Sequence, residues 1–185
     1  MFFKFRKAKK VNGYVIKPNA NLERAELTNT QLKGLNLRGV NFCAAKLSAS
    51  DLNNADLSDA DLSDAKLDSA QLNYVILSNA RLEGANLINA QLNYAILTGA
   101  KISRVILRNA SLKNADLKSA DLRGTDLENA NLSQANLSDC DLRGSDLQKA
   151  NLIGANLSGA KLDGANLDAI QSDEKTVLPD NFLLS

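Results

Sequence analysis

Pairs of aspartates twenty residues apart are the first side chains in this sequence that could do chemistry. Asp121 recurs at Asp141, and Asp126 recurs at Asp146. A fold that stacks residues at this interval would bring each pair of carboxylates close together. Two such carboxylates could hold a divalent cation or share a proton in acid–base catalysis. These four residues are therefore the strongest candidates for a chemical site.

An arginine lies two residues after Asp121 and again two residues after Asp141, at Arg123 and Arg143. Residues two apart in an extended segment point to the same side, so each guanidinium could neutralise its neighbouring carboxylate. Exposed ion pairs of this kind are common on protein surfaces and usually contribute little to stability. We therefore favour a neutralised surface ladder over a cation site or a catalytic pair, and we predict neither catalytic nor metal-binding residues.

Other chemistry finds little support in the composition. The absence of histidine excludes His-based triads and His-ligated metals. Cys43 and Cys140 lie too far apart for a CxxC site, no disulfide is expected, and a reducing compartment is the default. Phosphate-binding and dinucleotide-binding signatures are missing, as is an apolar run of about 20 residues that would span a membrane. We predict a cytoplasmic protein that is not an enzyme and binds no cofactor.

A five-residue period runs through most of the chain. From Leu22 to Leu167 a large apolar residue occupies every fifth position, thirty in all, and each is leucine except Phe42 and Ile102. Two residues before each stands alanine in twenty-one cases, and the nine exceptions are Thr30, Leu35, Val40, Ser50, Val75, Val105, Thr125, Cys140 and Ser145. The repeating unit is A-(D/N)-L-x-x.

A period of five fits neither a straight helix nor a straight strand. A helix would scatter the leucines around its circumference, and a strand would send successive leucines to opposite faces. Within one unit, however, Ala and Leu are two residues apart and share a side. If the chain turns a corner every five residues, all of these side chains can point to one axis. The pattern therefore predicts a solenoid with a dry core that leaves no room for a substrate cavity.

The unit resembles the pentapeptide-repeat protein family, in the leucine-rich form typical of cyanobacteria. The resemblance covers residues 20–169 and thirty consecutive units. It implies an all-β fold, a right-handed quadrilateral parallel β-helix with four units per coil and about seven and a half coils. Residues twenty apart would then stack. The recurrence of QLNYVILSNA (71–80) as QLNYAILTGA (91–100) supports that interval.

Three segments follow from the repeat. Residues 1–19 carry six basic side chains and no acid, which suggests a basic N-terminal arm or cap. Residues 20–169 form the solenoid, and residues 170–185 form a C-terminal cap or tail. Solenoid ends expose core and unpaired strand edges, so both ends need covering. The apolar cap candidates are Phe2, Phe3, Phe5, Val11, Tyr14, Val15 and Ile16 at the start, and Val177, Leu178, Phe182 and Leu183 at the end.

The two matching stretches place large residues at outward positions. The expected register stacks Tyr74 on Tyr94 and Ile76 on Ile96. Clustered exposed apolar groups mark interfaces, so these four residues are a candidate protein-binding patch. Two alternatives remain open: the stacked pairs could only stabilise the sheet, or the N-terminal arm could fold over them.

Charge is banded along the rod on either side of this patch. Acidic residues precede it, at Asp51, Asp56, Asp59, Asp61, Asp64 and Asp68. A candidate basic belt follows it, formed by Lys101, Arg104, Arg108, Lys113 and Lys118. The net charge of +1 argues against direct binding of nucleic acid.

Three functions are compatible with this sequence. We favour a protein-interaction rod, monomeric or dimeric, with a protein partner. The second is mimicry of DNA, because some family members protect DNA gyrase by resembling an acidic duplex; the mild acidity of the repeats and the basic belt argue against it. The third is attachment to an anionic membrane surface through residues 1–10, where basic side chains contribute about 1 kcal/mol each.

Overall fold

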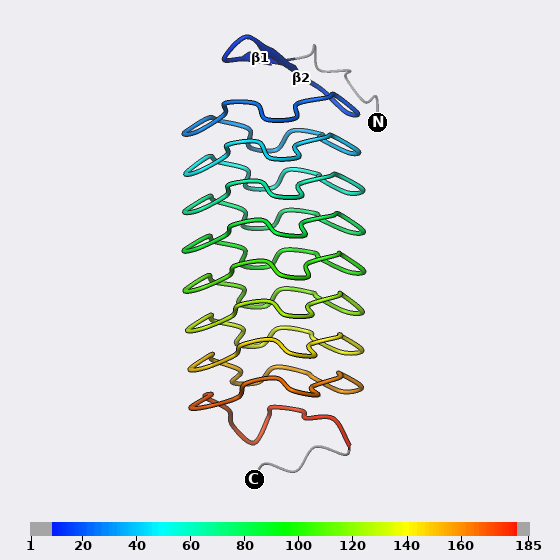
Figure 1. The fold of residues 1–185 in the computed structure, drawn as a ribbon, viewed down its shortest axis with the longest axis vertical. Helices are drawn as coiled ribbons and strands as arrows, with labels where there is room; N and C mark the ends of the chain where they lie inside the picture. Colours follow the sequence, from blue (N-terminus) through cyan, green and yellow to red (C-terminus); the bar gives the residue numbers. More distant parts are fainter. Residues whose placement is uncertain (1–8, 181–185) are drawn as a thin grey trace, which may run out of the picture.

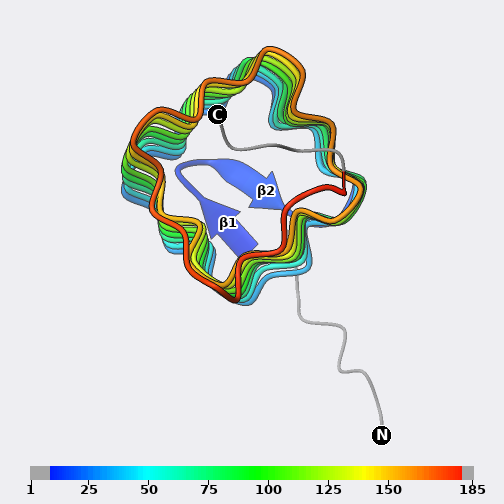
Figure 2. The same ribbon diagram turned by 90° about the horizontal axis from the view of Figure 1, so that it is seen from below.

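The computed structural model describes residues 9–180, which form a straight stack of coils. Figure 1 shows the coils piled along one axis, and Figure 2 shows that they superimpose on a four-lobed ring. Parallel single-residue bridges join each coil to the next, almost always at an interval of twenty residues, from Asn21↔Asn41 onward. Residues twenty apart therefore stack, as the sequence predicts.

Hydrogen bonds along the axis hold the coils together and use the main-chain N–H groups of each unit in a fixed way. In unit 61–65, the first N–H donates to the preceding coil, the second and fourth donate to the following coil, and the fifth closes a turn within the unit. The bonds are Asp61 N to Val40 O (2.9 Å), Leu62 N to Arg81 O (2.7 Å), Asp64 N to Glu83 O (3.0 Å) and Ala65 N to Leu62 O (3.0 Å).

The third N–H of the unit explains the preference for Asp or Asn at the first position. In unit 61–65 the N–H of Ser63 donates to Oδ1 of Asp61 at 2.9 Å. The same contact joins Cys43 to Asn41 at 2.9 Å. A short Asp or Asn side chain forms this turn two residues ahead of itself. The consensus residue thus satisfies the one donor that the ladder leaves out.

The fourth residue of each unit adopts a left-handed conformation. Values of φ near +57° recur at this corner, for example in Asn54, Asn79 and Asn114. The fourth residue is the third residue of a four-residue turn, where type II turns require positive φ. Glycine and asparagine tolerate this conformation best, and they are frequent here. The need for positive φ therefore determines which residues are favoured at the fourth position of every unit.

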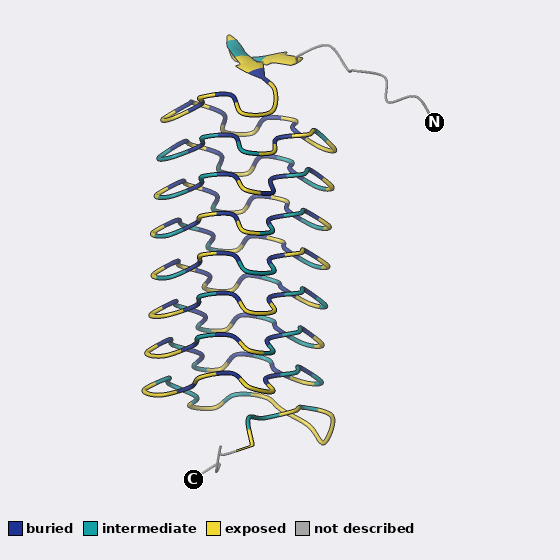
Figure 3. Ribbon diagram, turned by 90° about the vertical axis from the view of Figure 1, so that its right-hand side faces the viewer, coloured by how far each residue is buried: buried dark blue, intermediate teal, exposed yellow. Residues whose placement is uncertain are grey.

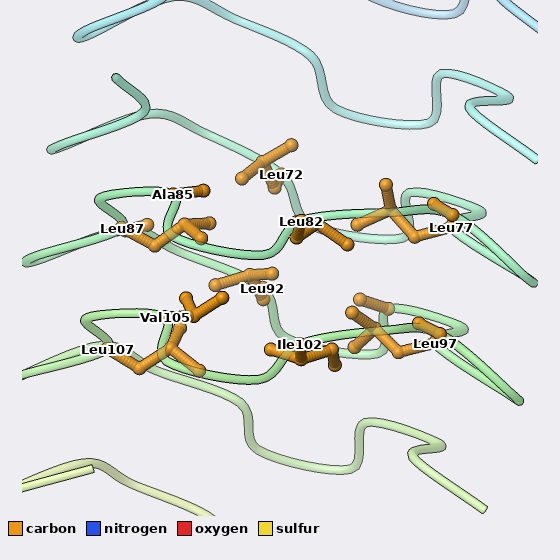
Figure 4. Close-up of a cluster of buried hydrophobic side chains, with 14 of the residues drawn as sticks. Leu72, Leu77, Leu82, Ala85, Leu87, Leu92, Leu97, Ile102, Val105 and Leu107 are labelled. Carbon is orange, nitrogen blue, oxygen red and sulfur yellow. The ribbon is translucent and has the colours of Figure 1, made fainter. Parts of the chain in front are cut away.

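Leucine and alanine side chains fill the axis completely. Figure 4 shows Leu72 and Leu82 pointing inward from one coil and Leu92 and Ile102 from the next, and each is at most 1% exposed. Figure 3 shows the same alternation of buried and exposed positions in every coil. Within residues 9–180 the core is packed, so a ligand would have to bind on the outside of this part of the rod.

Polar residues at inward alanine positions find partners within the core. The hydroxyls of Thr30, Ser50 and Ser145 donate to the carbonyl three residues earlier at 2.6, 2.6 and 2.7 Å. The hydroxyl of Thr125 reaches the carbonyl of Ile102 at 2.9 Å. Their burial is tolerated because each is hydrogen-bonded.

A β-hairpin covers the N-terminal end of the stack. Strand β1 (Lys9–Val11) pairs antiparallel with β2 (Tyr14–Ile16). Asn12 and Gly13 connect them with positive φ at both residues, as a two-residue type I′ turn requires. Figure 2 shows the hairpin lying across the ring. Ile16 is buried, Val11 and Tyr14 pack on the core, and Val15 stays exposed.

The hairpin supplies hydrogen-bond partners that a preceding coil would otherwise provide. The side chains of Lys9 and Asn12 donate to the carbonyls of Gln31 and Glu26. The hydroxyl of Tyr14 accepts from the N–H of Glu26 at 3.3 Å. These main-chain groups face the open end and have no coil above them. The hairpin therefore covers the end of the stack both by apolar packing and by hydrogen bonds.

The last coil closes with one extra residue. Its final bridge joins Asn156 to Val177, an interval of twenty-one. The N–H of Gly154 donates to Oδ1 of Asp173 at 2.9 Å, and the hydroxyl of Thr176 donates to the carbonyl of Leu152 at 3.0 Å. Leu178 packs on the core, whereas Val177 is exposed. The cap candidates Phe2, Phe3, Phe5, Phe182 and Leu183 lie outside the described residues.

The filled axis leads to a prediction about stability. We expect Leu92→Ala to lower the free energy of unfolding by roughly 2–5 kcal/mol, because the cavity would lie between coils that cannot collapse independently. Urea denaturation followed by circular dichroism measures this change. The matched control is Gln91→Ala at the neighbouring outward position, which should stay within about 0.5 kcal/mol of the wild type. Equal losses in both variants would contradict the packed axis.

Candidate protein-binding surface

Two tyrosines form an exposed stack on one corner of the rod. The rings of Tyr74 and Tyr94 are parallel to within 3°, and their centroids lie 4.9 Å apart. Tyr74 is 54% exposed and Tyr94 is 45% exposed. The twenty-residue register places them one above the other, as the sequence predicts. About half of each tyrosine therefore faces solvent, and the two rings cover one face of each other.

Both tyrosines occupy the left-handed corner position, with φ of 58° for Tyr74 and 60° for Tyr94. The same column holds Asn54 above them and Asn114 below them, residues that adopt this conformation at little cost. A bulky non-glycine residue there costs of order 1–3 kcal/mol. Burial does not offset that cost, because the rings are exposed. The tyrosines are thus locally unfavourable and stand where asparagine would fit better.

A ladder of asparagine side chains runs beside the stack. Asn53 Oδ1 accepts from the N–H of Asn73 at 2.8 Å, and Asn73 Oδ1 accepts from the N–H of Asn93 at 3.1 Å. The ladder ends at Lys113, whose N–H donates to Asn93 Oδ1 at 3.1 Å. Here Gln71, Gln91 and Ser111 occupy the first position of their units and form no Asx turn. The asparagine one coil earlier supplies the acceptor instead.

The tyrosines and asparagines line a shallow hollow of about 430 Å³. Its lining consists of Lys33, Asn53, Asn54, Asn73, Tyr74, Asn93 and Tyr94. The lining offers aromatic edges, amide groups and one lysine, and it contains no acid. It can contact a partner by stacking and by hydrogen bonds, but it holds no group arranged for catalysis.

Ile76 and Ile96 lie on the side next to this corner. They form a parallel bridge with each other, so they stack as predicted. Ile96 is 41% exposed, and Ile76 is half-buried. The β1–β2 hairpin lies at the N-terminal end of the rod, so residues 9–16 do not fold over the patch. Residues 1–8 of the predicted arm lie outside the described residues.

The basic belt is distributed around the rod and does not form one face. Within residues 9–180, only Arg108 of the belt is ion-paired, with Asp126 at 2.6 Å and Glu128 at 3.6 Å. Lys101, Arg104, Lys113 and Lys118 are the other members. In the acidic band, Asp59 pairs with Arg38 at 2.8 Å and Asp61 with Arg81 at 3.8 Å.

The stacked aspartates are neutralised by their arginines. Arg123 Nη2 lies 2.7 Å from Asp121 Oδ2, and Arg143 Nη2 lies 2.6 Å from Asp141 Oδ2. The hydrogen bond from Arg143 lowers the pKa of Asp141 to about 2, and the hydrogen bond from Arg123 lowers the pKa of Asp121 although Asp141 opposes it. Among residues 9–180, acidic and cysteine side chains form no group of three suited to a metal ion. The ladder is a charge-balanced surface.

Neither cysteine has the properties of a nucleophile. Burial raises the pKa of Cys140 to about 12, and its Sγ donates to the carbonyl of Leu117. The pKa of the half-buried Cys43 is also raised, first by burial and then by the nearby Asp61 and Glu23. A thiol with a raised pKa yields little thiolate at neutral pH. In the part of the chain that the structure describes, no helix has the length and apolarity needed to cross a bilayer.

A comparison with protein-family models matches the repeat region to pentapeptide repeats, in eight copies. The matches cover residues 18–42, 41–78, 65–104, 95–134 and 130–168. They span almost the whole stack. A comparison with curated proteins finds no match.

Solved structures support the same fold. HetL, a pentapeptide repeat protein involved in heterocyst differentiation regulation in the cyanobacterium Nostoc sp. strain PCC 7120, is 31% identical over 90% of this chain and 92% of its own, with a TM-score of 0.50. The pentapeptide repeat protein alr5209 from Nostoc PCC 7120 is 41% identical over 51% of this chain and 78% of its own, with a TM-score of 0.50.

A plasmid-mediated fluoroquinolone resistance protein, QnrB1, is more distant. It is 19% identical over 85% of this chain and 91% of its own, with a TM-score of 0.41.

The arginine-paired aspartates yield a prediction about pH. In Arg143→Gln we expect the pKa of Asp141 to rise from about 2 towards its ordinary value, because the main hydrogen bond to the carboxylate is removed. NMR titration of the side-chain carboxyl measures the shift. Because the folded-state pKa is depressed, the pair stabilises the fold above the unfolded pKa of about 4. The small difference in stability between wild type and variant should therefore vanish as the pH falls from about 4 to 2. An unchanged pKa would disprove the pairing.

The strained corner leads to a prediction about Tyr74. Tyr74→Asn removes a stacking contact of about 0.5–1.5 kcal/mol but relieves left-handed strain of similar size. We expect the free energy of unfolding to change by less than about 1 kcal/mol. Tyr74→Ala is the matched control, since it removes the ring while keeping the strain, and it should be less stable than Tyr74→Asn. A loss in Tyr74→Asn as large as that in Leu92→Ala would show that the ring is structural.

Proposed function

Because the chain belongs to the pentapeptide-repeat family, we propose that it is a non-enzymatic rod that binds a protein partner through the patch of Tyr74, Ile76, Tyr94 and Ile96. The observation that carries the proposal is the pair of exposed tyrosines in left-handed conformations. Arg104, Gln134 and Lys149 adopt the same conformation in other units, so the feature that sets this pair apart is two aromatic rings stacked at exposed positions, which favours a binding role.

The surroundings of the patch support this proposal. Residues 71–80 and 91–100 contain no charged side chain. Interface cores are depleted in charge and enriched in tyrosine, and tyrosine with asparagine and serine is typical of adaptable binding surfaces. A rigid rod also loses little conformational entropy when it binds.

The proposal extends to the rod as a whole. Residues 20–169, thirty units at four per coil, form about seven and a half right-handed coils with four sides. Residues 1–19 and 170–185 close the two ends, and the protein acts in the cytoplasm. The regulatory role of HetL makes a role in regulation part of this proposal. Attachment to a membrane surface would depend on residues 1–10, of which Lys9 contacts the first coil.

The experiment is affinity capture from native cells with two matched baits. The patch variant carries Tyr74→Asn, Ile76→Asn, Tyr94→Asn and Ile96→Asn, each a residue common at the same position of other repeats. The control variant carries Ile106→Asn and Ile153→Ser, which remove exposed isoleucines from elsewhere on the rod. We expect the patch variant to lose at least one partner that wild type and control retain. If both variants capture the same proteins as wild type, the patch is not the binding site.

A further inference from the structure

The patch is internally duplicated along the axis of the rod. Asn73, Tyr74 and Ile76 in one coil repeat as Asn93, Tyr94 and Ile96 in the next. The tyrosine stack, the asparagine ladder and the isoleucine bridge place each residue above its counterpart. Turning the patch end over end about a line between the two coils therefore exchanges like side chains. Such a surface can pair with itself.

The charges flanking the patch are of opposite sign at its two ends. Asp51 and Asp56 lie one coil before the patch, and Lys113 and Lys118 lie one coil after it, on the same two sides of the rod. None of these four forms an ion pair with another described residue. The surface thus has an uncharged centre, one end with the two acids Asp51 and Asp56, and a second end where the two lysines outnumber Asp116.

We propose that this face binds a second copy of the chain, with the two rods antiparallel and a two-fold axis passing between the Tyr74 and Tyr94 coils. This inference rests on the proposed function, since it names the partner of the same patch. Tyr74 of each copy then lies opposite Tyr94 of the other, and Ile76 opposite Ile96. Each acidic end meets a basic end, so Asp51 and Asp56 come near Lys113 and Lys118 of the second copy. The straight profile of the rod allows contact along its length (Figure 1).

Electrostatics select the antiparallel arrangement. Parallel rods would place Asp51 and Asp56 of one copy beside the same residues of the other, and Lys113 beside Lys113, which is unfavourable. In the antiparallel dimer Asp116 also lies near Asp56 of the second copy, and these two carboxylates repel each other. Groups already around Asp116 reduce this repulsion. Asp116 is already held by the amide of Asn136 at 3.0 Å and the hydroxyl of Thr98 at 3.2 Å, and Lys118 lies two residues away.

The dimer should be weak and sensitive to salt. The patch is small, and interfaces that bury less than about 1,200 Å² in total are usually weak or transient. Ion pairs at the rim of an interface are screened by salt. We expect a dissociation constant in roughly the micromolar range or weaker, rising with ionic strength.

Charge exchange provides the test, by sedimentation velocity at low salt over a range of concentrations. The acidic variant carries Lys113→Glu and Lys118→Glu, and the basic variant carries Asp51→Lys and Asp56→Lys. Lysine already stands at the position equivalent to Asp51 and Asp56 in other units, for example Lys66 and Lys101, so both variants should fold. Thermal melts check this. We expect wild type to dimerise, each variant alone to stay monomeric, and their equimolar mixture to regain association within about 3-fold of wild type.

Each other outcome overturns the proposal. A wild type that remains monomeric removes the second copy as the partner, and a mixture that remains monomeric removes the antiparallel charge pairing. Variants that dimerise like wild type would place the dimer contact elsewhere. Should the basic variant melt early, Ile76→Asn with Ile96→Asn must abolish the wild-type dimer. A monomeric wild type leaves affinity capture with the patch variant as an independent test of the proposed function.

Discussion

The hydrogen-bond ladder between coils is the constraint on which the rest of the structure depends. Four of the five N–H groups in a typical unit donate to main-chain carbonyls. The remaining N–H, that of the third residue, donates to the side chain of the first residue. This requirement explains both the constant twenty-residue interval and the Asp or Asn at the first position. It also leaves the first, third and fourth side chains of each unit facing outward. Only side chains at those positions can contact a partner and determine which partner binds.

The packed axis and the strained corner have opposite roles. Leucine and alanine fill the interior of residues 9–180 so fully that no internal site is left there, and polar deviations from alanine are satisfied by hydrogen bonds, as at Thr30. The tyrosines form no such hydrogen bond, and their mutual stacking is what offsets the strain. A core residue that departs from the consensus is accommodated by its neighbours. A surface residue that departs from the consensus is exposed to solvent and available to a partner.

Much of the fold could be predicted from the sequence because one period repeats thirty times. The same register predicted the Tyr74–Tyr94 stack and the pairing of Asp121 with Arg123, since both need only the interval and the direction of side chains. Sequence reasoning missed the hairpin, although the Asn12-Gly13 pair is a strong signal for a type I′ turn. It also missed the asparagine ladder, because Asn53 caps a donor twenty residues away and no local pattern reveals that contact. The register positions the patch and the basic belt, but a contact with a second molecule leaves no pattern within a single repeat.

The single-file stacking of side chains has a consequence for how such a protein can change in length. Insertion or deletion of twenty residues adds or removes one whole coil and leaves every column of side chains aligned. A change of five residues keeps the core intact but turns everything beyond it by a quarter of the circumference. Seven of the ten residues in 71–80 recur in 91–100, so this half of the coil keeps its surface pattern over one step of twenty. Surface patterns on this rod can therefore be inherited in steps of twenty, and shorter steps move them to a different side.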